Sequence, residues 1–250
     1  MKKKILIKFG SLVLLVIFIV VTTVLIVNQV KGLRCSGVEV FFKEKEHFVS
    51  EKAISNIVFS STKGLMGSKL KTLNTQRIEQ QIKKHPWVKN AEVYVGFESA
   101  DKKFFKGGVK VKVDQREPYY RYVTSGGGYY VDKEGYKMPF SRLNTVDVMV
   151  VTGRITPEIA KGELITLLEY IYDDTYLKSL IEQVHIRANG EFVLVPRVGG
   201  HLVELGYADD LDRKFRHLQA LYEDGFNGSD WGKYKYVSLK FRNQIVCTRK

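Results

Sequence analysis

The sequence predicts an α+β protein in which one N-terminal transmembrane helix precedes two domains outside the membrane. A long apolar run without charge lies near the start of the chain. The rest of the chain mixes segments of alternating apolar and polar residues, typical of half-buried strands, with segments that place apolar residues at helical spacing. Over all 250 residues, 44% are hydrophobic and 27% are charged, a globular composition that excludes a disordered or fibrous chain.

The apolar run predicts a membrane helix that stays on the mature chain. Residues 9–27 carry no charge, and 15 of these 19 are Leu, Ile, Val or Phe. A helix from residue 9 to Val30 would be about 33 Å long, which matches a hydrocarbon core of about 30 Å. A cleaved signal peptide has a shorter apolar region and a cleavage site of small residues, which this run lacks. A lipoprotein anchor at Cys35 is disfavoured by Arg34 immediately before it.

The flanking charges predict the orientation of this helix. Four lysines precede it within residues 1–8, so we expect a short cytoplasmic tail over 1–8, a span over 9–30 and the bulk of the chain outside the cytoplasm. The whole chain has a net charge of +13, and the exterior part keeps 36 basic and 27 acidic residues, a net charge of +9. Outside the cytoplasm, this charge suits an acidic envelope polymer or lipid headgroups as partner, or serves solubility alone, and it does not indicate nucleic acid.

A first exterior domain is predicted over residues 38–114. Its expected elements are a strand over 38–43, a helix capped by Ser50, a helix capped by Asn74 or Thr75, and strands over 88–97 and 109–113 that pair across a loop at 98–106. This order of strand, helix, helix, strand and strand suits one layer of helices on a three-stranded sheet. The residues expected in its core are Ile78, Ile82, Trp87, Val93, Val111 and Val113.

A second, β-rich domain with flanking helices is predicted over residues 115–250. The expected strands are 119–124 and 129–132, joined by the hairpin turn Ser125-Gly126-Gly127-Gly128, then 146–151, 181–187, 191–195 and 201–205, and a last hairpin of 234–241 and 244–248. One helix is expected to begin at Thr156-Pro157-Glu158 and continue through Ile171, and another to begin at Asp209 and Asp210.

The residues that carry chemistry form no catalytic, metal or cofactor pattern. The five histidines are scattered, and no nucleophile motif accompanies them. Asp209, Asp210 and Asp212 resemble a metal cluster, but we attribute them to capping of the helix that follows. Cys35 and Cys247 stand at opposite ends of the chain and predict neither a structural disulfide nor a zinc site. The sequence therefore predicts a binding protein, with no enzyme activity, cofactor or metal.

Several short segments, in their order along the chain, resemble a known family. They are Leu73-Asn74-Thr75, His85-Pro86-Trp87-Val88, Ala91-Glu92-Val93, Arg116-Glu117-Pro118, Tyr130-Val131-Asp132, Val203-Glu204-Leu205-Gly206 and Tyr236-Val237-Ser238-Leu239-Lys240-Phe241. Together with the membrane anchor, they resemble the bacterial cell-division proteins FtsQ and DivIB. The family usually has Asp where Ser238 stands and Arg where Lys240 stands.

This resemblance implies a POTRA domain over 38–114 and a partner-binding domain over 115–250. It also implies a non-enzymatic scaffold of the divisome, located in the inner membrane at the septum, that binds bitopic proteins of the FtsB and FtsL type and helps couple septal peptidoglycan synthesis to division. The expected partner contact is a strand at the sheet edge that consists of Tyr236, Val237, Ser238, Leu239, Lys240 and Phe241. Tyr236, Ser238 and Lys240 should face one side and Val237, Leu239 and Phe241 the other. By resemblance, Phe241 stands where the family has an aromatic residue needed for that contact.

Two alternatives come from other classes of protein. A POTRA-type component of outer-membrane assembly or secretion would carry a cleavable signal and continue into a barrel of alternating strands. An anchored envelope hydrolase would need two carboxylates that face each other across a cleft. A retained anchor would argue against the first alternative, and a cleft with two facing carboxylates would support the second.

Overall fold

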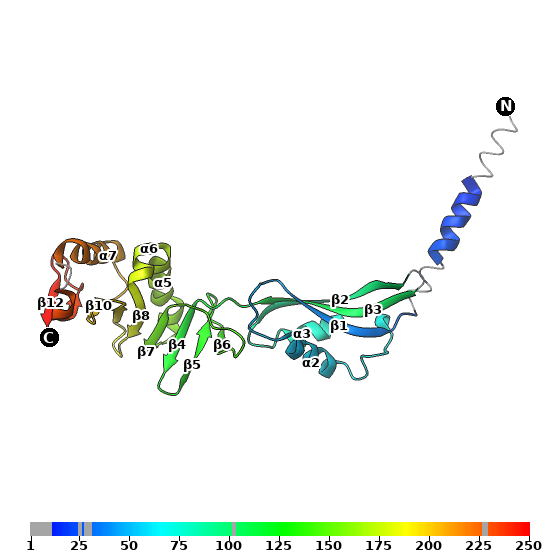
Figure 1. Cartoon of the computed structure of the whole chain (residues 1–250), viewed down its shortest axis with the longest axis horizontal. Coiled ribbons are helices and arrows are strands. Elements are labelled where there is room, and N and C mark those ends of the chain that lie inside the picture. Colours follow the sequence, from blue (N-terminus) through cyan, green and yellow to red (C-terminus); the bar gives the residue numbers. More distant parts are fainter. Residues whose placement is uncertain (1–11, 25–26, 28–31, 102–103, 227–229) are drawn as a thin grey trace, which may run out of the picture. The chain divides into compact units, whose positions relative to one another are not determined.

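A computed structural model describes residues 12–24, 27, 32–101, 104–226 and 230–250 (Figure 1). The chain divides into two compact units, Met1–Gln115 and Arg116–Lys250, which are described separately below. Both units contain helices and strands, so the α+β class is confirmed. The side chains of residues 97–101, 104–105 and 230 lie outside the description.

Residues 12–24 of the N-terminal segment are helical. Their apolar side chains are exposed, as for Leu14 with 69% and Phe18 with 66% of the residue accessible. Within the part of the chain that the structure describes, no helix is both long and apolar enough to cross a bilayer. The expected span over residues 9–30 extends beyond the described residues and stays a prediction.

The first unit is a three-stranded sheet with two helices. Its elements are β1 (Cys35–Phe42), α2 (Glu51–Ser61), the short 3-10 helix η1 (Leu70–Thr72), α3 (Thr75–Ile82), β2 (Val88–Asp101) and β3 (Phe104–Gln115). The strand order is β1-β3-β2, with β1 parallel to β3 and β2 antiparallel to β3. The predicted order of elements is confirmed. The predicted loop at 98–106 is wrong, because pairing of β2 with β3 continues from Val88–Gln115 to Asp101–Phe104.

Local side-chain chemistry explains where these helices start. The Ser50 hydroxyl accepts the backbone N–H of Ala53 at 3.1 Å, and the Asn74 side chain accepts that of Arg77 at 2.9 Å. The apolar side chains of α3 and the sheet meet in the core, and Trp87 stacks on Phe48 with ring centroids 4.5 Å apart. All six residues predicted to be buried here are at most 5% exposed: Ile78, Ile82, Trp87, Val93, Val111 and Val113.

The second unit contains a nine-stranded mixed sheet. The strands are β4 (Tyr120–Thr124), β5 (Gly127–Val131), β6 (Lys137–Pro139), β7 (Val150–Gly153), β8 (Ile181–Ile186), β9 (Phe192–Pro196), β10 (Leu202–Gly206), β11 (Tyr234–Ser238) and β12 (Val246–Arg249). The helices are α4 (Pro157–Lys161), α5 (Glu163–Asp173), α6 (Thr175–Leu180), α7 (Leu211–Ala220), the π-helical turn η2 (Leu221–Gly225) and the 3-10 turn η3 (Asp230–Lys233). The strand order is β12-β11-β10-β9-β8-β7-β4-β5-β6, and one apolar core joins α5, α6 and α7 to the sheet.

Most predicted elements of this unit are present, but several differ. The strand predicted over 146–151 is β7, which begins only at Val150 and ends at Gly153. The helix expected from Thr156 through Ile171 is interrupted at Gly162, whose φ of −115° and ψ of −102° are not helical, so α4 and α5 are separate. The helix α6 was not predicted; it begins after Asp174, whose carboxylate accepts the N–H groups of Tyr176 and Leu177. The three-residue β6 was also not predicted. The glycine-rich hairpin is confirmed, with Gly127 at a φ of +126°.

Candidate partner-binding surface

β11, which holds most of the predicted partner-contact residues, lies inside the sheet. Tyr236, Val237 and Ser238 pair with Leu202, Val203 and Glu204 of β10 on one side and with Thr248, Cys247 and Val246 of β12 on the other. The prediction that this segment is the edge strand is therefore wrong. β12 is the end strand, and among the described residues it has a strand neighbour on one side only.

The six predicted contact residues differ in exposure along the segment. Val237, Ser238 and Leu239 are at most 7% exposed, and Tyr236 is half-buried. Lys240 is exposed, and Phe241 is 48% exposed. Phe241 therefore does not share the environment of Val237 and Leu239 as predicted, because β11 ends at Ser238 and the alternation ends with it. The segment is therefore buried up to Leu239, and its last two residues, Lys240 and Phe241, are exposed.

A network of charged side chains holds the segment after β11. The Leu239 N–H donates to the backbone carbonyl of Glu204 at 2.9 Å, and the Lys240 ammonium donates to both carboxylate oxygens of Glu191 at 2.7 Å. Arg187 joins the same group, since it pairs with Glu191 at 3.3 Å and with the Glu204 carboxylate at 2.5 Å. The hydrogen bond from Lys240 is the main reason that the pKa of Glu191 lies below its usual value.

Arg213 of α7 fixes the backbone at Phe241. Its guanidinium donates to the carbonyl oxygens of Phe241 at 3.3 Å and Arg242 at 3.1 Å, and it pairs with Asp210 at 2.6 Å. Asp210 has a left-handed φ of 48°, a conformation that aspartate adopts more readily than most residues other than glycine. The Phe241 ring is thus an exposed aromatic group on an anchored backbone.

The aspartates before and within α7 do not cap this helix as predicted. Asp210 occupies the N-cap position, but its side chain makes no cap hydrogen bond, and its carboxylate pairs with Arg213. Asp209 accepts from the nearly buried ammonium of Lys214 at 2.5 Å, and Asp212 accepts from the Tyr170 hydroxyl at 2.8 Å. These ion pairs lower the pKa of Asp209 and of Asp210. Within the described residues, no group of three or more His, Cys, Asp or Glu side chains could hold a metal ion.

The end strand and the anchored segment together form what we name the C-terminal edge, defined as β12 with Phe241 and Arg242. Val246 is 38% exposed, and Thr248 and Arg249 are exposed, so the outer side of β12 is accessible. A strand at the end of a sheet presents unpaired N–H and C=O groups that another strand can pair with. Arg242, Arg249 and Lys250 make this surface basic, which favours an acidic or neutral partner segment.

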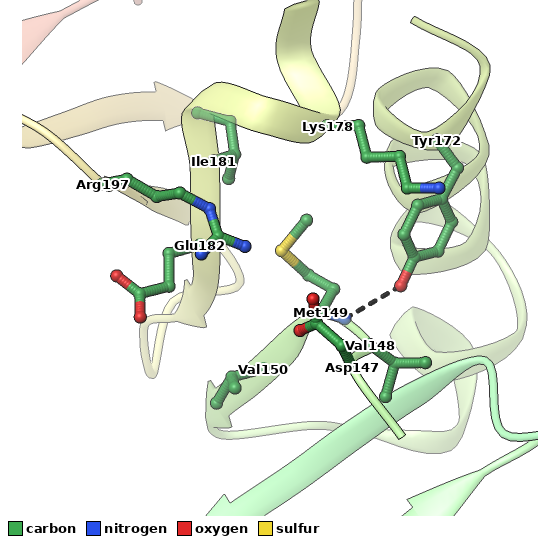
Figure 2. A pocket seen from close by; sticks show the side chains of 9 residues that line it. All are labelled: Asp147, Val148, Met149, Val150, Tyr172, Lys178, Ile181, Glu182 and Arg197. Atoms are coloured by element: carbon green, nitrogen blue, oxygen red, sulfur yellow. Dashed lines mark hydrogen bonds between the residues drawn. The ribbon is translucent and has the colours of Figure 1, made fainter. Parts of the chain in front are cut away.

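Two pockets of the second unit bear on the hydrolase alternative. The pocket of about 130 Å³ in Figure 2 contains the carboxylates of Asp147 and Glu182, but the Glu182 carboxylate points away from the pocket centre. Its Tyr172 hydroxyl is occupied, since it accepts the Met149 N–H at 2.9 Å and donates to the Tyr119 carbonyl at 2.8 Å. Burial raises the pKa of Tyr172. The facing carboxylates that a glycosidase needs are therefore not found in this pocket.

The second pocket, of about 250 Å³, lies between the β4–β5 hairpin and α4. Its lining has no carboxylate, histidine or cysteine side chain: Tyr120, Tyr122, Tyr129, Val131, Gly135, Lys137, Ile155, Thr156, Pro157, Ala160 and Lys161. The Tyr122 hydroxyl donates to the Gly153 carbonyl at 2.8 Å, and the Lys137 ammonium lies over the Tyr129 ring. Neither of these two pockets supports the hydrolase alternative.

Comparison with known proteins identifies the family of this chain. The family model for the FtsQ/DivIB C-terminal related region matches residues 117–248, which is more than half of the chain. The chain belongs to the FtsQ/DivIB family. A POTRA-like domain model matches residues 33–99, so the first unit contains a POTRA-like domain. The matched FtsQ/DivIB region contains all of β11 and nearly all of β12.

Two relatives in the FtsQ/DivIB family carry the name "Cell division protein FtsQ". The protein from Rhodothermus marinus is 27% identical over 193 residues, which cover 72% of this chain and 67% of the relative. The protein from Geotalea daltonii is 26% identical over 201 residues, which cover 74% of this chain and 66% of the relative. The chain thus matches about two thirds of the length of each relative.

The residues that hold Phe241 in place were not predicted from the sequence. Arg213 lies on α7, Glu191 immediately before β9 and Glu204 on β10, and no local pattern connects them to residues 239–242. The predicted last hairpin already contained the pairing of β11 with β12. Which of these two strands is the edge depends on the parallel pairing of β11 with β10, and the local sequence pattern does not predict that pairing.

Proposed function

We propose that this protein is a membrane-anchored cell-division protein that acts as a scaffold, without enzyme activity, for other division proteins at the septum. Membership of the FtsQ/DivIB family and the names of the two relatives support the role in division. The alternative of an outer-membrane assembly or secretion component would account for the POTRA-like match over residues 33–99 but not for the FtsQ/DivIB match over residues 117–248.

The proposed mode of binding is addition of a partner strand to the C-terminal edge. The observation that carries it is the position of β12 at the end of a nine-stranded sheet, next to an exposed Phe241 whose backbone is fixed by Arg213. Backbone pairing with β12 would supply affinity, and contact with the Phe241 ring would supply specificity. We assign the partner to the bitopic division proteins of the FtsB and FtsL type, through their segments outside the membrane.

The other predicted contact residues have different roles in this proposal. Val237, Ser238 and Leu239 are buried and hold the hairpin to the core, so they support the surface from beneath. Tyr236 and Lys240 are accessible in part, and Lys240 is engaged with Glu191. Direct contact with the partner is thus assigned to Phe241, Arg242 and β12.

The proposed topology keeps residues 1–8 in the cytoplasm, residues 9–30 in the inner membrane and the two folded units outside. The uncharged run and the lysines before it support this topology. Such a scaffold would hold its partners close to the membrane, where septal peptidoglycan synthesis is coupled to division.

A cross-linking experiment tests the proposed surface. A photo-reactive amino acid is placed at exposed Thr248 in the full-length chain in dividing cells, and the matched control carries it at exposed Tyr94 on the sheet of the first unit. Thr248 should form a cross-link to a bitopic division protein, and Tyr94 should not. Absence of a cross-link at Thr248, in a strain whose division depends on the labelled chain, would contradict the proposal.

A further inference from the structure

The loop between α2 and η1 is bonded to the first residues of the POTRA-like domain. The Gly67 N–H donates to the Cys35 carbonyl at 2.8 Å, and the Cys35 N–H donates to the Ser68 carbonyl at 2.9 Å. Arg34 and Lys69 form an isolated antiparallel bridge, and the Arg34 guanidinium donates to the Gly67 carbonyl at 2.6 Å. These bonds keep the loop beside the residues at which the chain enters the domain.

The same loop has buried and exposed members. Leu65 and Leu70 are at most 4% exposed, and Leu70 packs directly against Gly107 of β3, where no Cβ would fit. Met66 is 54% exposed, and Lys69 and Lys71 are exposed. The two leucines therefore anchor the loop and leave an apolar side chain and two ammonium groups toward solvent.

Four basic side chains belong to this loop, to η1 and to the residue before β1. We define the entry patch as Arg34, Lys63, Lys69 and Lys71 together with Met66. In the described part of the chain, none of its four cations forms an ion pair with a carboxylate. Lys106 stands near the patch but lies opposite Glu98 in the β2–β3 pairing, so it is not included.

Carboxylates of the first unit pair with lysines in other places. Glu39 pairs with Lys110 at 3.3 Å, and Asp114 pairs with Lys43 at 3.7 Å. The positive charge of the entry patch is therefore not neutralised by these acidic side chains.

Chain length limits how far the patch can lie from the proposed membrane span. Arg34 follows Val30, the last residue of that span, by four residues, and four residues of extended chain reach at most about 14 Å. Electrostatic attraction between surface charges extends over about 8 Å at physiological ionic strength. Arg34 is thus tethered within about two screening lengths of the end of the proposed span, and its bonds to Gly67 and Lys69 keep the loop beside it.

We propose that the entry patch binds anionic lipid headgroups, with Met66 against the headgroup boundary, and so orients the POTRA-like domain on the membrane. The inference rests on the proposed membrane anchor. Clusters of basic residues next to a membrane span are attracted to anionic lipids, and an exposed apolar side chain adds contact with the interface. Loss of two such charges should lower the ratio of docked to undocked domain about thirtyfold, from about fivefold for each charge.

The test uses the full-length chain in lipid nanodiscs of phosphatidylcholine, with or without phosphatidylglycerol. A fluorophore is attached to Met66→Cys in a Cys247→Ser background, in which the remaining Cys35 is buried. Quenching by doxyl-labelled lipid then reports contact with the bilayer. The control label is at exposed Lys52→Cys, at the start of α2. We expect quenching at position 66 that increases with phosphatidylglycerol and falls with salt, and little quenching at position 52.

Two charge variants complete the test. Lys69→Gln with Lys71→Gln should abolish the phosphatidylglycerol-dependent quenching, while the matched pair Lys43→Gln with Lys45→Gln, at the other end of β1, should preserve it. A chain that incorporates into nanodiscs but shows no quenching at position 66, or equal quenching in both lipids, would overturn the headgroup site and leave the anchor standing. A chain that does not incorporate would overturn the anchor and this inference with it.

Discussion

Substitution of Phe241 by alanine should weaken partner binding without unfolding the protein. The residue is 48% exposed, and a Phe side chain has an area of about 200 Å², so about 100 Å² is available for a partner to cover. At about 25 cal/mol per Å², complete coverage would contribute about 2.5 kcal/mol. Because coverage is partial and alanine keeps some contact, we expect a loss of about 1 to 2.5 kcal/mol, which is about 5- to 70-fold in Kd.

Isothermal titration of the full chain in nanodiscs with the exterior segment of the bitopic partner measures this loss. Arg213 bonds the backbone carbonyl of Phe241, so the substitution leaves that anchor in place, and thermal unfolding should change little. Phe59→Ala is the matched control, since Phe59 is 42% exposed on α2 of the other unit. Equal affinity for the Phe241→Ala variant and the unchanged protein, with normal unfolding, would refute a contact through this ring.

Three further predictions concern stability. Val111→Asp should lower the free energy of unfolding by several kcal/mol, because Val111 is fully buried. Lys112→Asp, on the exposed side of the same strand, should lower it much less. A normal melting temperature for Val111→Asp would refute the burial of Val111. Glu191→Gln should destabilise the protein at neutral pH, since the pKa of Glu191 is lowered mainly by the Lys240 hydrogen bond. That stabilisation is present above the unfolded-state pKa of about 4.3 and is lost as pH falls through the lower folded-state value, so melting curves of the two proteins should converge in acid. His201 is buried, which lowers its pKa, and its Nε2 lies 2.6 Å from the Tyr222 hydroxyl. The free energy of unfolding should therefore fall as pH drops below about 6.5, because His201 takes up a proton in the unfolded chain before it does so in the folded one. Denaturant titrations at several pH values measure this dependence, and His201→Gln should flatten it.

Local patterns predicted the first unit well because its determinants are local. Ser50 and Asn74 cap helices in the chain segments where they stand, and the alternation around Val111 directly reports the buried face of a strand. The extent of β2 and β3 was not predictable in this way. Lys, Phe and Gly residues around the expected loop show no alternation, yet pairing between the strands continues through them.

The partner surface was predicted near the C-terminus of the chain, but β11 was wrongly taken as the edge strand in place of β12. The hairpin at the C-terminus was expected, but the sequence contains no local signal for the parallel pairing of β11 with β10, and this pairing makes β12 the end strand. The exposure of Phe241 depends on where β11 stops. That point is fixed by contacts with Glu204 and Arg213, which lie 28 or more residues away in the chain and cannot be inferred from the segment itself.

Amide hydrogen exchange of the full chain, with and without the partner segment, tests strand addition at the C-terminal edge most directly. Partner binding should slow exchange within β12, because backbone N–H groups on its outer side would become hydrogen-bonded. β6, at the opposite end of the same sheet, serves as the internal reference and should exchange at an unchanged rate. Slower exchange at β6 with no change in β12, or bound partner with no change at either strand, would contradict the account.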